Sequence, residues 1–594
     1  MEIHVKIKEV HIENWRSIQS TTLDYQDLMI FIGQNNHGKS NILSALLFFF
    51  GEIKFQELDF HNDADELSVE IIFSDLDKND QSTFSKYVTS ANEIRVRKKA
   101  YSSGSFDYKG YLQNPVEEWL QECNASAYTS RTIAITLPFV DFLPETGRIT
   151  QANIKLAQSE YIARNIDAIE FNYEIEDSNF LGLKNVVKGI FGQIYYIPAI
   201  RNATDDYVTK ETSAFGSLYS KLIEKMSSAN SEWITAKENI SNLFGLLNKK
   251  DEEGNHNTER PQELTRFEER LSSHLSSWGA EIDVEIVAPN IDDVFKANTQ
   301  VWVNDGVKTD INRKGHGLQR ALSFALIKTI AETLREERLI AEEAGGNNGT
   351  RKASDSMYFI LEEPELYLHP QAQRALFDSL VLLVDGGAQV TLCTHSSALI
   401  DLEYYKSICI VRKDQSGSGT TVCQCTEDIF TGNNKKDFNL SYWVNPDRSE
   451  LFFAHKVILV EGATEKTVIP YIAQRINCFK HEYSVIDCGS KNNIPAYIGL
   501  LNKFHIPYVA VYDIDHQSGK SQAALDSANV ATAGIENVLD LNYGTTIAFI
   551  NDIEEELGMP QGTSGKPYAA LEEISKFDFV VEERFRNKIL AMYE

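Results

Sequence analysis

The chain has 594 residues, of which 42% are hydrophobic and 24% are charged, a composition typical of folded globular proteins. Its 57 Lys and Arg residues against 86 Asp and Glu residues give a net charge of −29, which excludes binding of nucleic acid or acidic membranes through overall charge. Any contact with nucleic acid must therefore be local or bridged by metal ions. At about 100–200 residues per domain, this length predicts three or four domains.

Sequence signals for membranes and disulfides are missing. No segment reaches the roughly 18 consecutive apolar residues that a membrane span needs, and acidic residues stand where a signal peptide would have its apolar run. The seven Cys residues form no C-x-x-C pair, so we assign no structural metal to sulfur. We therefore expect a cytoplasmic protein without membrane contacts.

The first 60 residues predict a strand, a phosphate-binding loop and a helix. LMIFIG is a short apolar strand, SNILSALLFFFG is an apolar helix, and GQNNHGKS between them fits the pattern G-x-x-x-x-G-K-[ST]. In this pattern backbone N–H groups cradle phosphate, Lys39 reaches the outer phosphates and Ser40 ligates Mg²⁺. We expect a nucleotide site formed by Gly33, Asn35, Asn36, Gly38, Lys39 and Ser40.

The spacing of apolar residues changes twice in the middle of the chain. Between residues 65 and 200, the runs LSVEIIF, EIRVRKKAY, TIAITLPF and IYYIPAI alternate and favour a mixed α/β fold. From 203 to 280, apolar residues recur three and four apart, which predicts an inserted helical hairpin or bundle.

Residues 310–410 carry the other parts that a nucleotide site needs. An apolar strand ends in Glu362, which would hold the Mg²⁺ shell, and Glu363, which would orient or deprotonate the attacking water. His395 closes the strand VTLCT, where it can sense a γ-phosphate. A strand that ends in Glu and a single His are both often structural, so these residues count in combination. A Gly-rich turn at a helix N-terminus and a polar stretch after the first helix add Gly315, Gly317, Gln319 and Gln56.

These motifs, in this order, resemble the ABC-type ATPases related to RecF and SMC proteins. ENWRSI precedes the loop, GHGLQ stands in place of the signature motif, LEEPELYLHP matches Walker B plus D-loop, and THSSALI matches the switch-histidine segment. The match spans about residues 5–410, with Glu362 where Asp is usual. The resemblance implies ATP held between two heads, hence a homodimer or higher homo-oligomer, and a dimerisation role for 203–280. A solvated helical decoration is the alternative for that insert.

A second α/β unit begins near residue 455. The strand KVILV ends at Glu461, and Glu465 follows one helical turn later. The segment VAVYDID puts Asp513 and Asp515 on one face of an extended chain. Four carboxylates at the carboxyl ends of parallel strands suit Mg²⁺ or Mn²⁺.

The motifs VEGATEK, GSKNN and DID resemble the Toprim domain of topoisomerases, primases and certain nucleases. An ABC-type head followed by Toprim is similar to the OLD (overcoming lysogenisation defect) family nucleases, which include the Gabija nuclease and effectors encoded beside retron reverse transcriptases. The resemblance implies ATP and a two-metal site for Mg²⁺ or Mn²⁺. It also implies that Asp552 and Glu554 are further metal ligands and that Lys566 stabilises the transition state.

The resulting hypothesis is an ATP-regulated, metal-dependent DNA endonuclease in defence against phage. An ATP-gated DNA clamp or sensor with an inactive Toprim site is the alternative, and a Toprim nucleotidyl transferase is disfavoured because the chain lacks zinc-finger and helicase modules. A partner encoded nearby could be a helicase or a retron reverse transcriptase with its RNA–DNA product. The predicted parts are an ATPase region in two pieces, a helical dimerisation element, a linker and a Toprim domain: 1–202 and 281–412, 203–280, 413–450, and 451–594.

Overall fold

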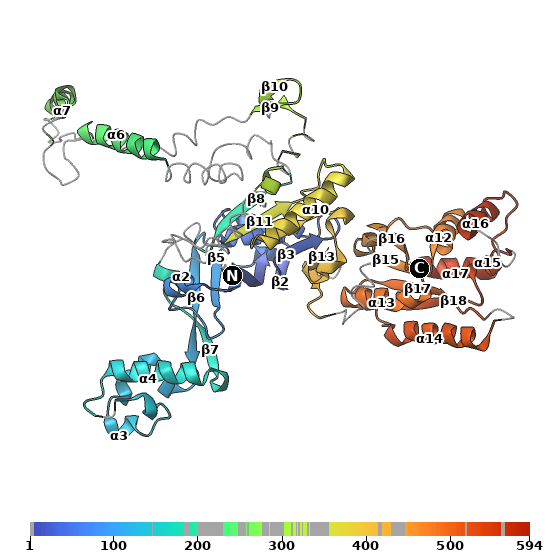
Figure 1. Cartoon of the computed structure of the whole chain (residues 1–594), viewed down its shortest axis with the longest axis horizontal. Coiled ribbons are helices and arrows are strands. Elements are labelled where there is room, and N and C mark those ends of the chain that lie inside the picture. Colours follow the sequence, from blue (N-terminus) through green and yellow to red (C-terminus); the bar gives the residue numbers. More distant parts are fainter. Residues whose placement is uncertain are drawn as a thin grey trace. The chain divides into compact units, whose positions relative to one another are not determined.

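The structure is a computed structural model, and it divides into two compact units (Figure 1). One unit comprises 195–333 and 366–368, and the other comprises the rest of the chain. The residues that the structure describes are 5–144, 146–182, 190–199, 230–247, 257, 260–275, 284, 302–310, 313–315, 318, 321–322, 325–329, 332, 356–413, 419–428, 446–516, 520–559 and 565–594.

The N-terminal region forms a six-stranded antiparallel sheet. The runs LSVEIIF and EIRVRKKAY lie in its neighbouring strands β4 (Glu66–Ser74) and β5 (Ile94–Tyr101); burial alternates along β5, whereas five consecutive residues of β4 are buried. The order across the sheet is β2 (Ile18–Asp24), β1 (Lys6–Trp15), β4 (Glu66–Ser74), β5 (Ile94–Tyr101), β6 (Phe106–Pro115) and β7 (Phe171–Ile175).

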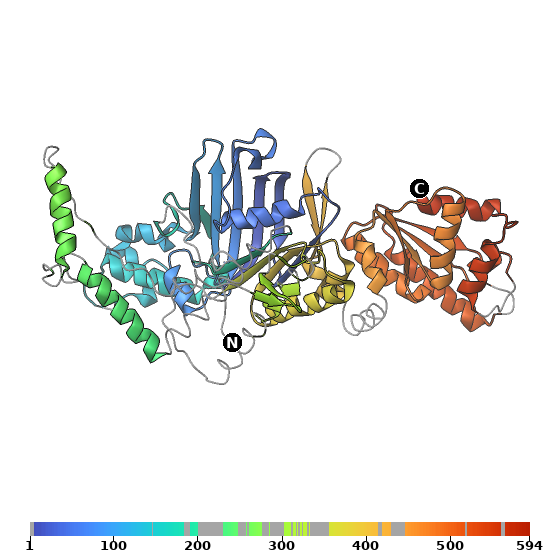
Figure 2. The same ribbon diagram turned by 90° about the horizontal axis from the view of Figure 1, so that it is seen from above.

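A second six-stranded sheet carries the predicted nucleotide motifs. Helix α1 (Lys39–Phe49) contacts both sheets, and its almost wholly apolar sequence is buried between them (Figure 2). The central strands β3, β12 and β11 are parallel, as expected for strands buried on both faces. The order is β14 (Thr420–Gln424), β13 (Ile408–Lys413), β3 (Leu28–Ile32), β12 (Gln389–Cys393), β11 (Met357–Glu362) and β8 (Gln193–Ile197), with α10 (Pro370–Asp385) between β11 and β12 in the chain.

One expectation from sequence needs correction in this region, and one of the alternating runs is helical. TIAITLPF forms helix α3 (Arg131–Ala134) and a turn, because Ala134 and Phe139 pack into a small helical core while Ile133 and Ile135 are exposed. The predicted linker 413–450 contains β14, which pairs with β13 in the sheet. The helical core lies between β6 and β7 and includes η3 (Glu118–Leu120), η4 (Glu122–Tyr128), η5 (Val140–Phe142), α4 (Gln151–Arg164) and η6 (Ile166–Ala168).

The other compact unit contains two helices where an inserted helical element is expected. They are α6 (Ser231–Leu247) and α7 (Gln262–Leu275), and a short hairpin, β9 (Trp302–Asn304) and β10 (Lys308–Asp310), follows them. A buried pair joins Arg260 to Glu268 through two hydrogen bonds of 2.6 and 2.8 Å. Within 203–280, the residues other than 230–247, 257 and 260–275 lie outside the described residues.

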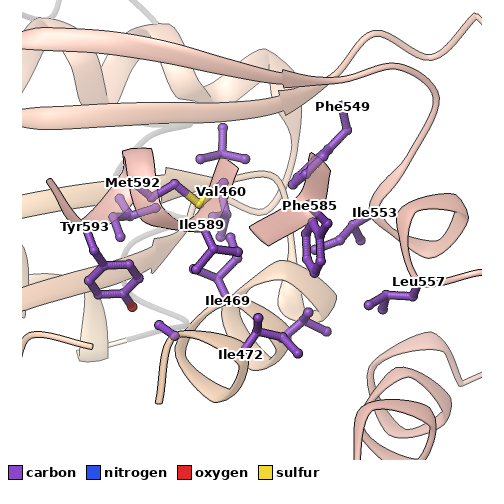
Figure 3. Packing of buried hydrophobic residues seen from close by; sticks show 14 of the residues in the cluster. Val460, Ile469, Ile472, Phe549, Ile553, Leu557, Phe585, Ile589, Met592 and Tyr593 are labelled. Carbon is purple, nitrogen blue, oxygen red and sulfur yellow. The ribbon is translucent and has the colours of Figure 1, made fainter. Parts of the chain in front are cut away.

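The C-terminal region is a four-stranded, wholly parallel sheet flanked by helices. Its core packs β15, β17 and β18 against α12 and the C-terminal helix α17 (Figure 3). Sequence predicted three strands, and β18 is a fourth. The elements are β15 (Lys456–Val460), α12 (Ala463–Arg475), β16 (Tyr483–Asp487), α13 (Ile494–Lys503), β17 (Tyr508–Asp513), α14 (Gln522–Val538), β18 (Gly544–Phe549), α15 (Ile553–Glu556), α16 (Lys566–Ile574) and α17 (Glu583–Tyr593). Within the described part of the chain, no helix is long and apolar enough to cross a membrane.

Candidate functional site

The loop between β3 and α1 has the backbone shape of a phosphate cradle. Gly33 and Gly38 have backbone φ angles of 146° and 105°, which residues other than glycine rarely adopt. A Cβ atom on Gly33 would lie 2.2 Å from the carbonyl oxygen of Val411, and one on Gly38 would lie 2.2 Å from Oγ1 of Thr420. The hairpin β13–β14 therefore packs directly against the loop and leaves no room for a side chain at either glycine.

Lys39 folds back onto this loop. Its Nζ donates hydrogen bonds to the carbonyl oxygens of Gly33 (2.9 Å) and Gln34 (3.0 Å). Burial lowers the pKa of Lys39, while the charges of Glu363, Glu365 and Glu362 oppose that shift. The ammonium group is thus held where an anionic phosphate can replace the loop carbonyls as its partner.

The acidic end of β11 meets the end of β12 beside Lys39. Glu363 has a positive φ of 43° and donates its N–H to the carbonyl of Cys393 (2.9 Å). Nε2 of His395 lies 3.7 Å from Oε1 of Glu363, and the N–H of His395 donates to Oε1 of the buried Glu365 (2.7 Å). Burial and the charge of Lys39 lower the pKa of His395, which favours a neutral imidazole. This places the predicted base and the predicted phosphate sensor side by side.

The remaining predicted nucleotide contacts are spread over both units. Gln56 precedes the short helix η1 (Glu57–Asp59), and its N–H donates to Oδ2 of Asp59 (2.7 Å). Arg16 connects this segment to α1, because its Nε donates to Asp59 (2.7 Å) and its Nη1 to Asn41 (3.4 Å). Gly315 lies in the unit that comprises 195–333. Gly317 and Gln319 lie outside the described residues.

A second site lies at the carboxyl ends of the parallel strands β15 and β17. Oε1 of Glu461, which follows β15, accepts the N–H of Asp513, the last residue of β17 (2.7 Å). The residue Asp513 is 8% exposed, and its Oδ1 has no hydrogen-bond partner among the described residues. A buried carboxylate oxygen without a partner is costly, so this site suits a cation that can bind the oxygen.

The surrounding carboxylates raise each other's pKa. Burial, followed by the charges of Glu461, Glu465 and Asp515, raises the pKa of Asp513 to about 9. Burial, followed by Glu461 and Glu554, raises the pKa of Glu465 to about 7. Such mutual repulsion shows that the predicted acidic residues share one small region, which is the condition that a divalent cation relieves.

Lysines also approach these carboxylates. Nζ of Lys566 lies 3.1 Å from Glu554, and Nζ of Lys520 lies 2.8 Å from Asp515. A third lysine, Lys491, is buried near Asp513. Sequence reasoning identified Lys566 but missed the other two. Lys491 lies in the motif GSKNN, which supported the Toprim resemblance but gave this lysine no function. No local sequence pattern marks Lys520.

Asp552 and Glu554 lie at the start of α15, which follows β18. The side chain of Asp552 accepts the N–H of Glu555 (2.9 Å), as a helix N-cap does, and its charge also reaches Asp513. Among the described residues, no three His, Cys, Asp or Glu side chains already stand in ligand geometry. The hard oxygen donors and the unpartnered Asp513 oxygen nevertheless fit a divalent ion such as Mg²⁺ or Mn²⁺.

Comparison with known proteins gives a family match for each of the two regions that carry these sites. An AAA ATPase domain model matches residues 5–400, and a model of the overcoming lysogenization defect protein-like TOPRIM domain matches residues 452–515. The chain belongs to the OLD family of nucleases. The predicted resemblance is thereby confirmed, as is the prediction of an enzyme with ATPase and nuclease activity.

Two named relatives align with most of this OLD-family chain, and a third aligns with about half of it. The Old nuclease of Escherichia phage P2 is 25% identical over 91% of this chain and 84% of its own. The endonuclease GajA of Bacillus cereus strain VD045 is 21% identical over 95% of this chain and 82% of its own. The OLD nuclease of Thermus scotoductus is 26% identical over 46% of this chain and 51% of its own. The two family models confirm the predicted fold class, an α/β ATPase head followed by a Toprim domain, and imply that the chain uses nucleotide and divalent metal.

Proposed function

We propose that this OLD-family chain is an ATP-binding and ATP-hydrolysing, divalent-metal-dependent DNA endonuclease that acts in defence against phage. The observation that carries the proposal is the buried Asp513, whose Oδ1 lacks a partner among the described residues while its pKa is raised to about 9 by burial and neighbouring carboxylates. The endonuclease GajA, which aligns with 95% of the chain, supports internal cleavage of DNA.

The acidic residues would hold two divalent ions. Such ions activate water and neutralise the charge that develops on a phosphodiester during hydrolysis. The expected ligands come from β15, α12, β17 and the start of α15: Glu461, Glu465, Asp513, Asp515, Asp552 and Glu554.

Glu461 and Lys566 would have further roles at the acidic site, besides the binding of metal. Glu461 fixes the end of β17 by accepting the Asp513 N–H. Lys566 begins α16 and has a side chain that is 48% exposed, so it can turn from Glu554 to an incoming phosphate. Its charge would then stabilise the phosphorane.

In the ATPase head, Lys39 and Ser40 would bind phosphate and Mg²⁺, Glu362 would support the metal and Glu363 would act as base beside His395. The Gly315–Gln319 segment of one copy would complete the nucleotide site of another, as the resemblance to ABC-type ATPases implies. Light scattering of the Glu363→Gln variant with ATP tests this assembly. A monomeric mass would contradict it.

Cleavage is tested by incubating the purified full-length protein with supercoiled plasmid DNA. Mg²⁺ or Mn²⁺, each with and without ATP, should yield nicked or linear DNA, and EDTA should prevent it. Intact plasmid under all conditions, with DNA binding retained, would favour the alternative of an ATP-gated sensor. Plating of phage on bacteria that express the wild-type or Asp513→Asn protein tests the defence role, because only the wild type should reduce plaque numbers. Whether a helicase or a reverse transcriptase is needed stays a prediction that co-expression can test.

A further inference from the structure

Lys491 is a buried lysine beneath the acidic site. It begins the short helix η13 (Lys491–Asn493), which joins β16 to α13, and it is only 7% exposed. Its Nζ donates a hydrogen bond to the main-chain carbonyl of Asp513 and lies 5.3 Å from the centre of the Tyr512 ring. A buried ammonium group is expensive unless it has a specific partner, so this contact needs a reason.

The reason lies in how β17 ends. β15 pairs with β17 only through residues 508–510, so the last three residues of β17 extend beyond this pairing. On the other side, β17 pairs with β18 as far as Asp513. The peptide groups of Asp513 that face β15 therefore need partners from side chains.

Two side chains supply those partners. Glu461 accepts the N–H of Asp513 (2.7 Å), and Lys491 donates to its carbonyl. Both the N–H and the C=O of Asp513 are thus held on the side that faces β15, and its carboxylate is directed into the acidic cluster. Asp515, two residues later, has a φ of 64°, so the chain turns sharply just after the point that Lys491 holds.

The three lysines of the site differ in their bonding partners and in their exposure. Lys520 and Lys566 pair directly with carboxylates and are 32% and 48% exposed at their side chains, so incoming cations or phosphates can displace them. Lys491 is bonded to the backbone and enclosed, so it stays in place when those ligands arrive.

We propose that Lys491 is a positioning residue of the nuclease site, which orients the carboxylates of Asp513 and Asp515 for divalent metal by holding the Asp513 carbonyl. It does not contact the substrate. This inference rests on the proposed metal-dependent cleavage.

The experiment measures Mn²⁺ binding to the full-length, metal-free protein by calorimetry and electron paramagnetic resonance, with plasmid cleavage alongside. Lys491→Met removes the donor, Lys491→Gln keeps a neutral donor and Lys491→Arg keeps both donor and charge. Lys576→Met is the matched control, because Lys576 is an exposed lysine of the same domain that pairs with Glu573. ATP hydrolysis and thermal unfolding verify that each variant is folded.

Lys491→Met should weaken Mn²⁺ binding and slow cleavage by about 10- to 100-fold each, the usual effect of losing a residue that orients metal ligands. Lys491→Arg should recover most of both. Removal of a positive charge alone would tighten Mn²⁺ binding, so weaker binding reports orientation.

Unchanged or tighter Mn²⁺ binding with wild-type cleavage in Lys491→Met would overturn the positioning role. If Lys491→Met fails to fold, Lys491→Ala, which also removes the donor but leaves a smaller side chain, tests the same role, and a Mn²⁺ affinity equal to that of the wild type in Lys491→Ala would overturn it. Wild-type protein that neither binds Mn²⁺ nor cleaves plasmid would instead refute the proposed function.

Discussion

The nucleotide site and the acidic site differ in which part of the chain forms them. The loop around Gly33 and Gly38 is shaped by backbone, and its lysine rests on loop carbonyls until phosphate arrives. The acidic site is made of buried side chains that repel one another, so Asp513 and Glu465 have pKa values raised to about 9 and about 7. A backbone site is thus stable when empty, whereas a carboxylate site is strained until protons or metal ions compensate its charge.

The largest expected effect comes from removing the central carboxylate. Asp513→Asn should reduce plasmid cleavage by about 10²- to 10³-fold, since it removes a charge on which metal binding depends. ATP hydrolysis should be unchanged. Asp526→Asn, on the exposed part of α14, is the control. Equal cleavage by the two variants would show that the acidic site is only surface charge and does not serve catalysis.

In the ATPase head, two substitutions should separate binding from turnover. Lys39→Ala should abolish ATP binding, because the phosphates lose their cation. Glu363→Gln should bind ATP but hydrolyse it about 10²-fold more slowly, since the base is lost. Filter binding and phosphate release measure the two steps. Wild-type turnover in both variants would refute the nucleotide site.

Lys566 should affect the reaction rate without strengthening metal binding. Lys566→Ala keeps every carboxylate and removes a positive charge beside Glu554, so Mn²⁺ affinity should hold or rise while cleavage at saturating Mn²⁺ falls about 10²-fold. Lys576→Ala should retain wild-type cleavage. A parallel loss of Mn²⁺ affinity would instead assign Lys566 to metal binding through Glu554.

Stability of the metal-free protein should fall as pH rises. The folded pKa of Asp513, about 9, exceeds its ordinary value of 3.8, so the folded state binds the extra proton between those values. That contribution is fully present below about pH 4 and is lost as pH rises through about 9. Thermal melts in EDTA should show a weaker decline in Asp513→Asn than in the wild type, and Mn²⁺ should restore stability at high pH.

A smaller effect of opposite sign is expected in the head. Lys98 is buried, donates to the carbonyl of Phe48 (2.6 Å), and has its pKa lowered by burial to about 8. The unfolded chain binds this proton more tightly up to about pH 10.5, so stability should rise between about pH 8 and 10.5. Lys98→Met should flatten this slope relative to the wild type. Identical slopes would show that Lys98 does not titrate in this range.

Sequence reasoning succeeded where a pattern and its chemistry are local. GQNNHGKS, the strand that ends in Glu362 and Glu363, and the carboxylates after β15 and β17 all lie at the strand ends where they were expected. The alternating run TIAITLPF did not reveal its helical structure, because alternation over a few residues does not show which neighbours cover them. Lys491 was missed because its partner, the Asp513 carbonyl, is created by tertiary folding.

The contact between the phosphate-binding loop and the hairpin β13–β14 also limits how the gene can vary. Thr420 occupies the space that a Cβ atom on residue 38 would need, donates to the His37 carbonyl (2.9 Å) and meets Ser17 (2.7 Å). Position 38 is already glycine, so it cannot shrink to accommodate a larger residue at position 420. Substitutions at Thr420 are therefore restricted to side chains no bulkier than threonine. The sequence of the phosphate-binding loop thus limits which residues can be accepted in β14, although the two segments lie far apart in the chain.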